Sequence, residues 1–252
     1  MAYVTRDGVR LHYRVSGCGP AIVLQHALTN DHRAFEIIGL RQALVDAGFT
    51  CVTMDSIGHG KSDIPNQRSR YTLAEQSRDL IAVVNDVGLK EFSIVGYSMG
   101  AWVASGTVVA AGHRVRTAIL GGWDPMEGAR RFTKFSDDVA KRNAEFEGTI
   151  RNLFAARPGS VQPAQAQIVA YLNCYHELFM PLPSMANLAN AQVGLRFFCG
   201  EDDPYRLNVA RAATQHSIPF QTVPGDHIGA FTAPESARLI LNWLAEERCA
   251  SA

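Results

Sequence analysis

The first residues of the chain alternate between polar and apolar side chains on either side of one turn. Residues 1–17 read MAYVTRDGVRLHYRVSG, with Asp7 and Gly8 between two alternating runs. A period of two is typical of a half-buried β-strand, and Asp-Gly between two such runs is typical of a tight hairpin turn. The pattern predicts a β-hairpin, and not a signal peptide, which would begin with basic residues followed by an apolar run.

Six later runs are apolar almost throughout, as expected for strands that a sheet buries on both faces. They are residues 21–27, 50–55, 92–98, 116–122, 194–200 and 219–225. Helical patterns lie between and after them, the last over residues 234–244. The clearest helix begins at Thr72, whose hydroxyl can cap it while Glu75 completes a capping box, and Gly88 is a natural stop. This alternation predicts an α/β fold with a mostly parallel, doubly wound sheet.

One interval lacks this rhythm. Between about residue 125 and residue 190 the sequence shows helix-like stretches but no convincing strand. A structureless loop of that length would be rare in a compact domain. We therefore expect a core made of residues 1–124 and 191–252, with residues 125–190 forming an all-helical insertion.

Composition and charge narrow the class of protein. The chain has 252 residues, 47% of them hydrophobic, and a formal net charge of zero. It lacks the basic surface of a nucleic-acid-binding protein and any apolar run approaching the roughly 18 residues of a membrane span, and the balance favours a small, roughly neutral ligand. The cysteines are scattered, which favours free thiols in a cytoplasmic protein over a metal site or a disulfide framework. They are Cys18, Cys51, Cys174, Cys199 and Cys249.

The stretch GYSMG, residues 96–100, places a serine between two glycines. The strand-like FSIVGY precedes Ser98, and the helix-like SMGAWVASGTVVAA includes and follows it. A sharp turn from strand to helix crowds the backbone, so the positions two residues either side of the serine must be small, as Gly96 and Gly100 are. A glycine-rich turn with an incidental serine is the alternative. The context favours a nucleophile held on a strained turn.

A serine nucleophile needs a base, and histidine suits this role because its ordinary pKa of about 6.5 lets it take and return a proton. His227 follows the last predicted strand, in PGDHIGAF, where parallel sheets place their chemistry. The histidine in turn needs an anion to hold its ring. GEDDP, residues 200–204, follows the preceding strand and offers Glu201, Asp202 and Asp203. An acidic turn without a catalytic role is the alternative.

Together, QHALTN, DSIGHGKSD, GYSMG, GEDDP and PGDHIGAF occur in the order found in α/β-hydrolases. Over essentially its whole length the chain resembles a serine member of that superfamily with a small helical cap. The resemblance implies that Asp203 is the acid of a Ser98–His227–Asp203 triad, with Asp202 as runner-up. Some members take the acid from the preceding strand end, where GGWDP places Asp124.

The resemblance also implies an oxyanion hole built from the backbone N–H groups of Met99 and Leu28. Ala27 stands where the family usually has glycine, so its Cβ could shift the loop that carries Leu28. His26 and His59 match positions that brace these loops, and His26 is also a candidate pocket residue.

By the same resemblance, the insertion should lie over the carboxyl edge of the sheet as a lid. Its aromatic residues are expected to form mainly the core of the cap, and Trp123 is the best candidate for a pocket wall. These aromatic residues are Phe132, Phe135, Phe146, Phe154, Tyr171, Tyr175 and Phe179.

These residues predict hydrolysis of small to medium carboxylic esters through an acyl-enzyme, with no metal or organic cofactor. The resemblance argues against haloalkane dehalogenases and epoxide hydrolases, which carry aspartate in place of Ser98. Lactone opening, carbon–carbon bond hydrolysis, perhydrolysis and non-catalytic small-molecule reception stay open as alternatives. The expected partner is a small ester or lactone, with no nucleic acid and no membrane, and association into a homo-oligomer is left open.

Overall fold

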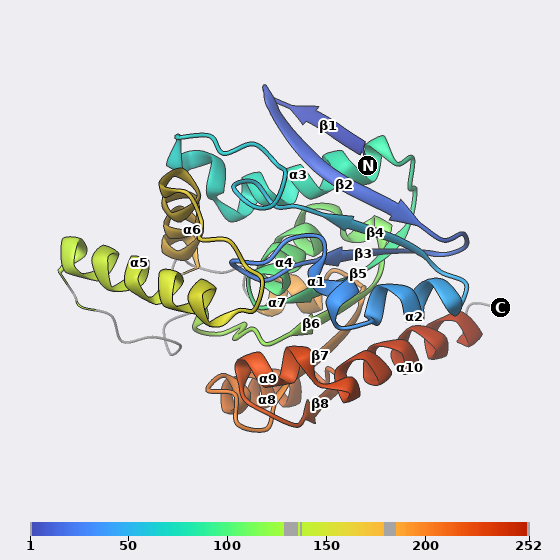
Figure 1. The fold of residues 1–252 in the computed structure, drawn as a ribbon. Helices are drawn as coiled ribbons and strands as arrows, with labels where there is room; N and C mark the ends of the chain where they lie inside the picture. The colour runs from blue at the N-terminus through green and yellow to red at the C-terminus, as the bar shows by residue number, and fades with distance from the viewer. Residues whose placement is uncertain (1, 129–135, 137, 179–184, 251–252) are drawn as a thin grey trace.

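The computed structural model describes residues 2–128, 136, 138–178 and 185–250, with side chains to residue 246. Its centre is a single eight-stranded sheet in the order β1-β2-β4-β3-β5-β6-β7-β8 (Figure 1). Strands β1 (Ala2–Arg6) and β2 (Val9–Ser16) form the predicted antiparallel hairpin. Strand β2 is also antiparallel to its other neighbour, β4 (Thr50–Met54).

The remaining pairs in the sheet are all parallel, which confirms the predicted fold class. Each predicted apolar run corresponds to one strand, with ends that differ by at most two residues. Besides β4, these are β3 (Ala21–Gln25), β5 (Phe92–Tyr97), β6 (Val115–Gly121), β7 (Gly194–Gly200) and β8 (Phe220–Val223).

Helices cover both faces of the sheet and bury a separate core on each (Figure 1). Along β3, Val23 packs on one face while Ile22 and Leu24 pack on the other, because successive side chains of a strand point to opposite faces. One face is covered by α3 (Leu73–Asp86), α4 (Met99–Ala111), α7 (Met185–Ala189) and α8 (Arg206–Gln215). The other is covered by α1 (Ala34–Ile37), α2 (Leu40–Asp46), α9 (His227–Thr232) and α10 (Pro234–Ala250).

Helix α3 starts as predicted but without the full capping box. The Thr72 hydroxyl accepts the N–H of Glu75 at 3.4 Å. The Glu75 carboxylate instead accepts hydrogen bonds from Arg6 at 2.6 Å and Arg70 at 2.5 Å. Two guanidinium groups attract a carboxylate more strongly than one backbone N–H does. The Thr72 cap is therefore present, whereas the Glu75 half of the capping box is replaced by a contact between the β1–β2 hairpin and α3.

Between β6 and β7 the described residues form helices and no strand, the longest being α5 (Val139–Ala156) and α6 (Gln165–Glu177). Phe146, Tyr171 and Tyr175 pack with Ile150 into a buried cluster of their own, as expected for a cap core. The domain division at residues 125 and 190 stays a prediction, and Phe132, Phe135 and Phe179 lie outside the described residues.

Two short 3-10 helices, η1 (Arg68–Tyr71) and η2 (Gly112–Arg114), complete the described elements. In the part of the chain that the structure describes, no helix combines the length and apolarity needed to cross a membrane. Cys18, Cys51, Cys174 and Cys199 are free thiols, as predicted, and the side chain of Cys249 lies outside the description.

Candidate active site

Ser98 sits on a strained turn between the end of β5 and the start of α4. Its φ and ψ are 54° and −119°, outside the regions that ordinary L-residues favour. A Cβ on Gly96 would lie 2.3 Å from the carbonyl oxygen of Gly100, and a Cβ on Gly100 would lie 2.0 Å from that of Gln25. Both positions therefore require glycine if α4 is to start this close to the sheet.

His227 lies beside Ser98, with its Nε2 atom 3.0 Å from Ser98 Oγ. It follows the last strand, as predicted, and is the first residue of α9. Asp226 caps that helix by accepting the N–H groups of Ile228 and Gly229, so the helix begins one residue after the turn. The Tyr97 hydroxyl donates to the carbonyl of His227 at 2.7 Å, which ties α9 to the end of β5.

Asp203 is the acid that contacts His227. Its Oδ2 atom lies 2.9 Å from His227 Nδ1, and the carboxylate is fully buried. Asp202 is exposed. Asp124 is buried, but one of its oxygens accepts from the Asn208 side chain at 2.6 Å. The structure thus joins Ser98, His227 and Asp203 in one chain of contacts and brings neither of the other two acids into it.

Met99 and Leu28 lie next to this group. Met99 is the first residue of α4 and is fully buried, and Leu28 follows β3 in the loop that faces the serine. Ala27 is not among the described non-glycine residues with a positive φ, whereas Thr29 is, at 66°. The strain in this loop therefore falls on Thr29 and not on the alanine that replaces the usual glycine.

A cavity of about 250 Å³ opens at Ser98 and His227. Trp123 lines it, as predicted, whereas His26 lies outside it. Tyr205 and Arg157 were missed from the sequence. Tyr205 directly follows the acidic turn and packs edge-on against His227, with ring centroids 5.5 Å apart, so its position offered a signal. The other lining residues are Ala27, Leu28, Thr29, Asn30, Tyr97, Phe146, Thr149, Ile150, Leu153, Tyr175, Leu178, Ile228 and Phe231.

His26 is excluded from the cavity because it is buried as a brace. Its Nε2 accepts the N–H of Ser56 at 3.0 Å, and its Nδ1 donates to the carbonyl of Ala27 at 2.8 Å. The His59 ring lies 5.0 Å away, and its Nδ1 donates to the carbonyl of Ile57. Both histidines therefore tie together the loops that follow β3 and β4, as the sequence predicted.

Burial lowers the pKa of His59 to about 3, because charging the ring would place it in an apolar interior beside His26. The unfolded chain takes up a proton at about pH 6.5 that the folded chain excludes. Stability is therefore complete above that pH and is lost as the pH falls. Between pH 6.5 and pH 5 this histidine alone should lower the free energy of unfolding by about 2 kcal/mol.

Urea unfolding at pH 7.5, 6.5 and 5.0 tests this expectation. His59→Phe should unfold with a shallower dependence on pH than the wild type, whereas His113→Gln, at an exposed position, should keep the wild-type dependence. Equal pH dependences in the wild type and His59→Phe would contradict it.

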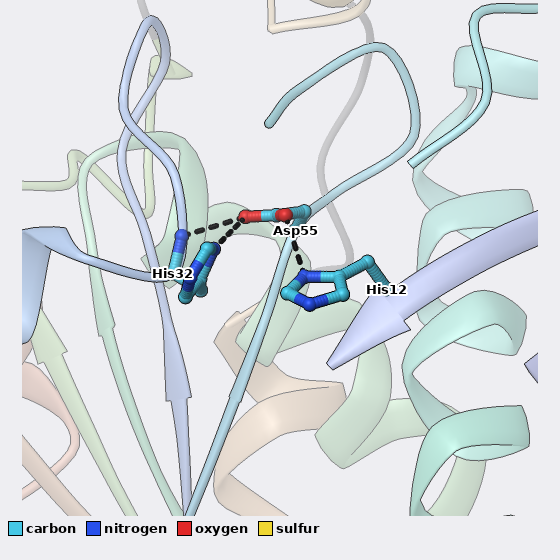
Figure 2. A group of neighbouring side chains, drawn as sticks. All are labelled: His12, His32 and Asp55. Atoms are coloured by element: carbon cyan, nitrogen blue, oxygen red, sulfur yellow. Dashed lines mark hydrogen bonds and ion pairs between the residues drawn. The ribbon is translucent and has the colours of Figure 1, made fainter. Parts of the chain in front are cut away.

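A second brace involves His12, His32 and Asp55, all of them buried (Figure 2). The Nδ1 atoms of His12 and His32 each lie 2.8 Å from one carboxylate oxygen. The backbone N–H groups of His32 and Lys61 donate to the same two oxygens, at 2.7 Å and 2.8 Å. Burial alone would raise the pKa of Asp55, but these hydrogen bonds hold the pKa well below its usual range.

The ligand atoms of this group lie within 4.8 Å of one another, so its residue types could hold a metal ion. Each oxygen of Asp55 already accepts two N–H hydrogen bonds, however, and both Nδ1 atoms are occupied by them. The arrangement is that of a hydrogen-bonded brace. It joins β2, the loop after β3 and the loop after β4, and so fixes the loop that carries Leu28.

Known proteins share both the sequence pattern and the fold. The family model for the alpha/beta hydrolase fold matches residues 20–180. Bifunctional epoxide hydrolase 2 of Sus scrofa is 30% identical over 95 residues, 38% of this chain and 17% of that protein. The matches to the first curated relatives span only 17 to 41% of those relatives' lengths.

Solved structures match over nearly the whole chain. A carboxylesterase structure from Nitrososphaera gargenis has a TM-score of 0.78 at 14% identity and covers 98% of this chain and 99% of that one. The enol-lactonase of Burkholderia xenovorans LB400 has a TM-score of 0.73 at 18% identity, covering 97% and 100%. At these identities the likeness establishes the fold alone. Because the family model covers well over half of the sequence and the sheet has the matching architecture, this chain belongs to the alpha/beta hydrolase fold family.

Proposed function

We propose that this protein is a serine hydrolase that cleaves small carboxylic esters through an acyl-enzyme. The observation that carries the proposal is the continuous chain of contacts from Ser98 Oγ to His227 Nε2 at 3.0 Å and from His227 Nδ1 to Asp203 Oδ2 at 2.9 Å. The serine is strained, faces a cavity and lies where a substrate carbonyl can reach it. A glycine-rich turn with an incidental serine needs neither partner.

In the first half of the reaction, His227 Nε2 takes the hydroxyl proton while Ser98 Oγ forms a bond to the carbonyl carbon. The carbonyl oxygen becomes an oxyanion, and we expect the backbone N–H groups of Leu28 and Met99 to stabilise it. The histidine then gives its proton to the leaving alcohol oxygen as the carbon–oxygen bond breaks. An acyl group stays on the serine.

In the second half, water gives a proton to His227 Nε2 and adds its oxygen to the acyl carbon. The bond to Ser98 breaks, the serine oxygen regains the proton and the acid is released. Asp203 accepts a hydrogen bond from His227 Nδ1 and so holds the imidazole in the tautomer with hydrogen on that atom. The Tyr97 hydroxyl supports the same ring through the His227 backbone.

The size of the cavity favours short acyl groups. At about 250 Å³ it is smaller than the roughly 300–1,000 Å³ of sites for drug-sized ligands. We expect kcat/KM for p-nitrophenyl acetate and butyrate to exceed that for the octanoate by about tenfold or more, because extra methylenes forced into a filled cavity displace packed side chains at a cost of about 1–3 kcal/mol. Steady-state rates on the three esters measure this, and fastest cleavage of the octanoate would contradict it.

A lactone is an internal ester, so the same three residues would open it by the same steps. Similarity to an enol-lactonase structure supports lactones as the second candidate substrate class. Rates on γ-butyrolactone and ethyl butyrate, compared at equal concentration, separate the two. Epoxide hydrolysis, suggested by the name of the Sus scrofa relative, is not proposed, because Ser98 stands where such enzymes carry an aspartate nucleophile.

A further inference from the structure

The cavity contains one unbalanced charge. Its walls are mainly aliphatic and aromatic, and among the described residues that line it Arg157 alone carries a permanent charge. Neither a lysine nor a carboxylate belongs to the described lining. An apolar cavity can bind a neutral ester without a guanidinium group. Binding of a neutral ester therefore does not explain why Arg157 lines the cavity.

Arg157 is held in place from two sides. It follows the last residue of α5, and its Nη1 and Nη2 atoms donate to the carbonyl and the hydroxyl of Thr29 at 3.1 Å and 3.2 Å. Its guanidinium carbon lies 5.2 Å from the centroid of the Phe154 ring. A guanidinium has five N–H donors, so Thr29 engages only part of this capacity, and the fork is fixed before any ligand arrives.

The charge of Arg157 is partly desolvated, and although Asp31 attracts it electrostatically, it forms no ion pair with another residue that the structure describes. The group is half-buried, and this burial lowers the pKa of Arg157. The nearest acidic candidate on the same loop, Asp31, is paired with Arg33 at 2.7 Å. A cation withdrawn from water costs free energy unless an anion lies beside it. A ligand can supply that anion.

We propose that the cavity takes an ester or lactone whose acyl part ends in a carboxylate, with that carboxylate paired to Arg157 while the reacting carbonyl lies at Ser98. The inference rests on the proposed hydrolase function and names its substrate class. Arginine suits this role because its planar fork binds both oxygens of a carboxylate. The zero net charge of the whole chain gives no hint of it, since that balance averages over the entire surface.

The same contacts allow a competing explanation in which Arg157 only positions the loop. Thr29 has a positive φ of 66°, and Arg157, at the end of α5, donates a hydrogen bond to its carbonyl. Loss of the arginine would then disturb Leu28 and slow every substrate alike. The two explanations therefore differ in whether the loss depends on the charge of the substrate.

The test compares p-nitrophenyl butyrate with the mono-p-nitrophenyl esters of glutaric and adipic acid, in the wild type, Arg157→Met, Arg157→Lys and Arg151→Met. Arg151 lies on the same helix but pairs with Glu147 outside the cavity, so its variant is the matched control for lost charge. We expect Arg157→Met to lower the ratio of kcat/KM for the anionic esters to that for butyrate by about 10- to 150-fold, the range for hydrogen bonds between charged groups. Arg157→Lys should recover part of this ratio, and Arg151→Met should leave it unchanged.

An equal loss on butyrate and on the anionic esters would assign Arg157 to positioning and overturn the proposal, as would an unchanged ratio in Arg157→Met. Competitive inhibition by glutarate is a second readout, expected in the wild type and weakened in Arg157→Met. The butyrate arm keeps the two proposals separate. If Ser98→Ala hydrolyses butyrate as fast as the wild type, the hydrolase proposal fails. If only the dependence on charge is missing, the substrate class alone fails.

Discussion

Replacing Ser98 with alanine should lower the turnover of p-nitrophenyl butyrate by at least about a thousandfold, because the acyl-enzyme cannot form without the serine oxygen. The residue change removes one oxygen and leaves the strained turn, the two glycines and the cavity in place. The variant should therefore fold and bind as the wild type does. Initial rates at saturating ester, with thermal unfolding of both proteins as the check on folding, measure the effect.

Variants of Asp203 and of its neighbour Asp202 provide the control for this prediction. Asp203→Asn should also lose about 10⁴-fold in kcat, because the amide favours the wrong tautomer of His227. Asp202→Asn, one residue earlier and exposed, should stay within a few-fold of the wild type. Retained activity in both Ser98→Ala and Asp203→Asn would show that the proposed triad does not carry the reaction.

Replacing Asp55 with alanine should lower the free energy of unfolding by about 3–5 kcal/mol, because each buried donor left without an acceptor costs about 1–3 kcal/mol. The variant leaves four N–H donors in an interior without an acceptor, two from histidine rings and two from the backbone. A typical domain has only about 5–15 kcal/mol of stability to lose. For a chain of this size the melting temperature should fall by about 10 °C or more.

Asp63→Ala is the matched control for the brace. Asp63 lies in the same loop and accepts from Arg10, but its carboxylate is partly exposed, so its removal should cost about 1 kcal/mol or less. Calorimetry or urea unfolding at pH 7.5 on the three proteins decides the question. Equal stability losses for Asp55→Ala and Asp63→Ala would mean that the buried Asp55 carboxylate does not stabilise these loops more than the partly exposed Asp63 carboxylate does.

Much of the fold was predictable because local patterns and global packing agree. Each buried strand is indicated by apolar residues on both of its faces, and Gly96 and Gly100 indicate the close start of α4 against the sheet. Ser98, His227 and the acidic turn at residues 200–204 follow from the order of strand ends, since parallel strands deliver their loops to one edge. The choice of Asp203 within that turn came from the resemblance to α/β-hydrolases.

The misses share a physical cause, which is competition from residues distant in the sequence. The capping box offered the Glu75 carboxylate the nearby backbone N–H of Thr72. The carboxylate instead binds Arg6, which lies more than sixty residues earlier in the chain. His26 was a candidate pocket residue, yet the backbone N–H of Ser56 in the next loop holds its ring away from the cavity. Arg157 could not be assigned at all, because only the docking of α5 brings it to Thr29.

The helices over the cavity all come from one continuous stretch between β6 and β7, two strands that lie side by side in the sheet. Ser98, Asp203 and His227 all come from outside that stretch. Substitutions, insertions and deletions within it therefore alter which molecules reach the serine while the reacting atoms keep their places. In such a chain, evolution can change the choice of substrate through the residues between β6 and β7 without displacing Ser98, Asp203 and His227.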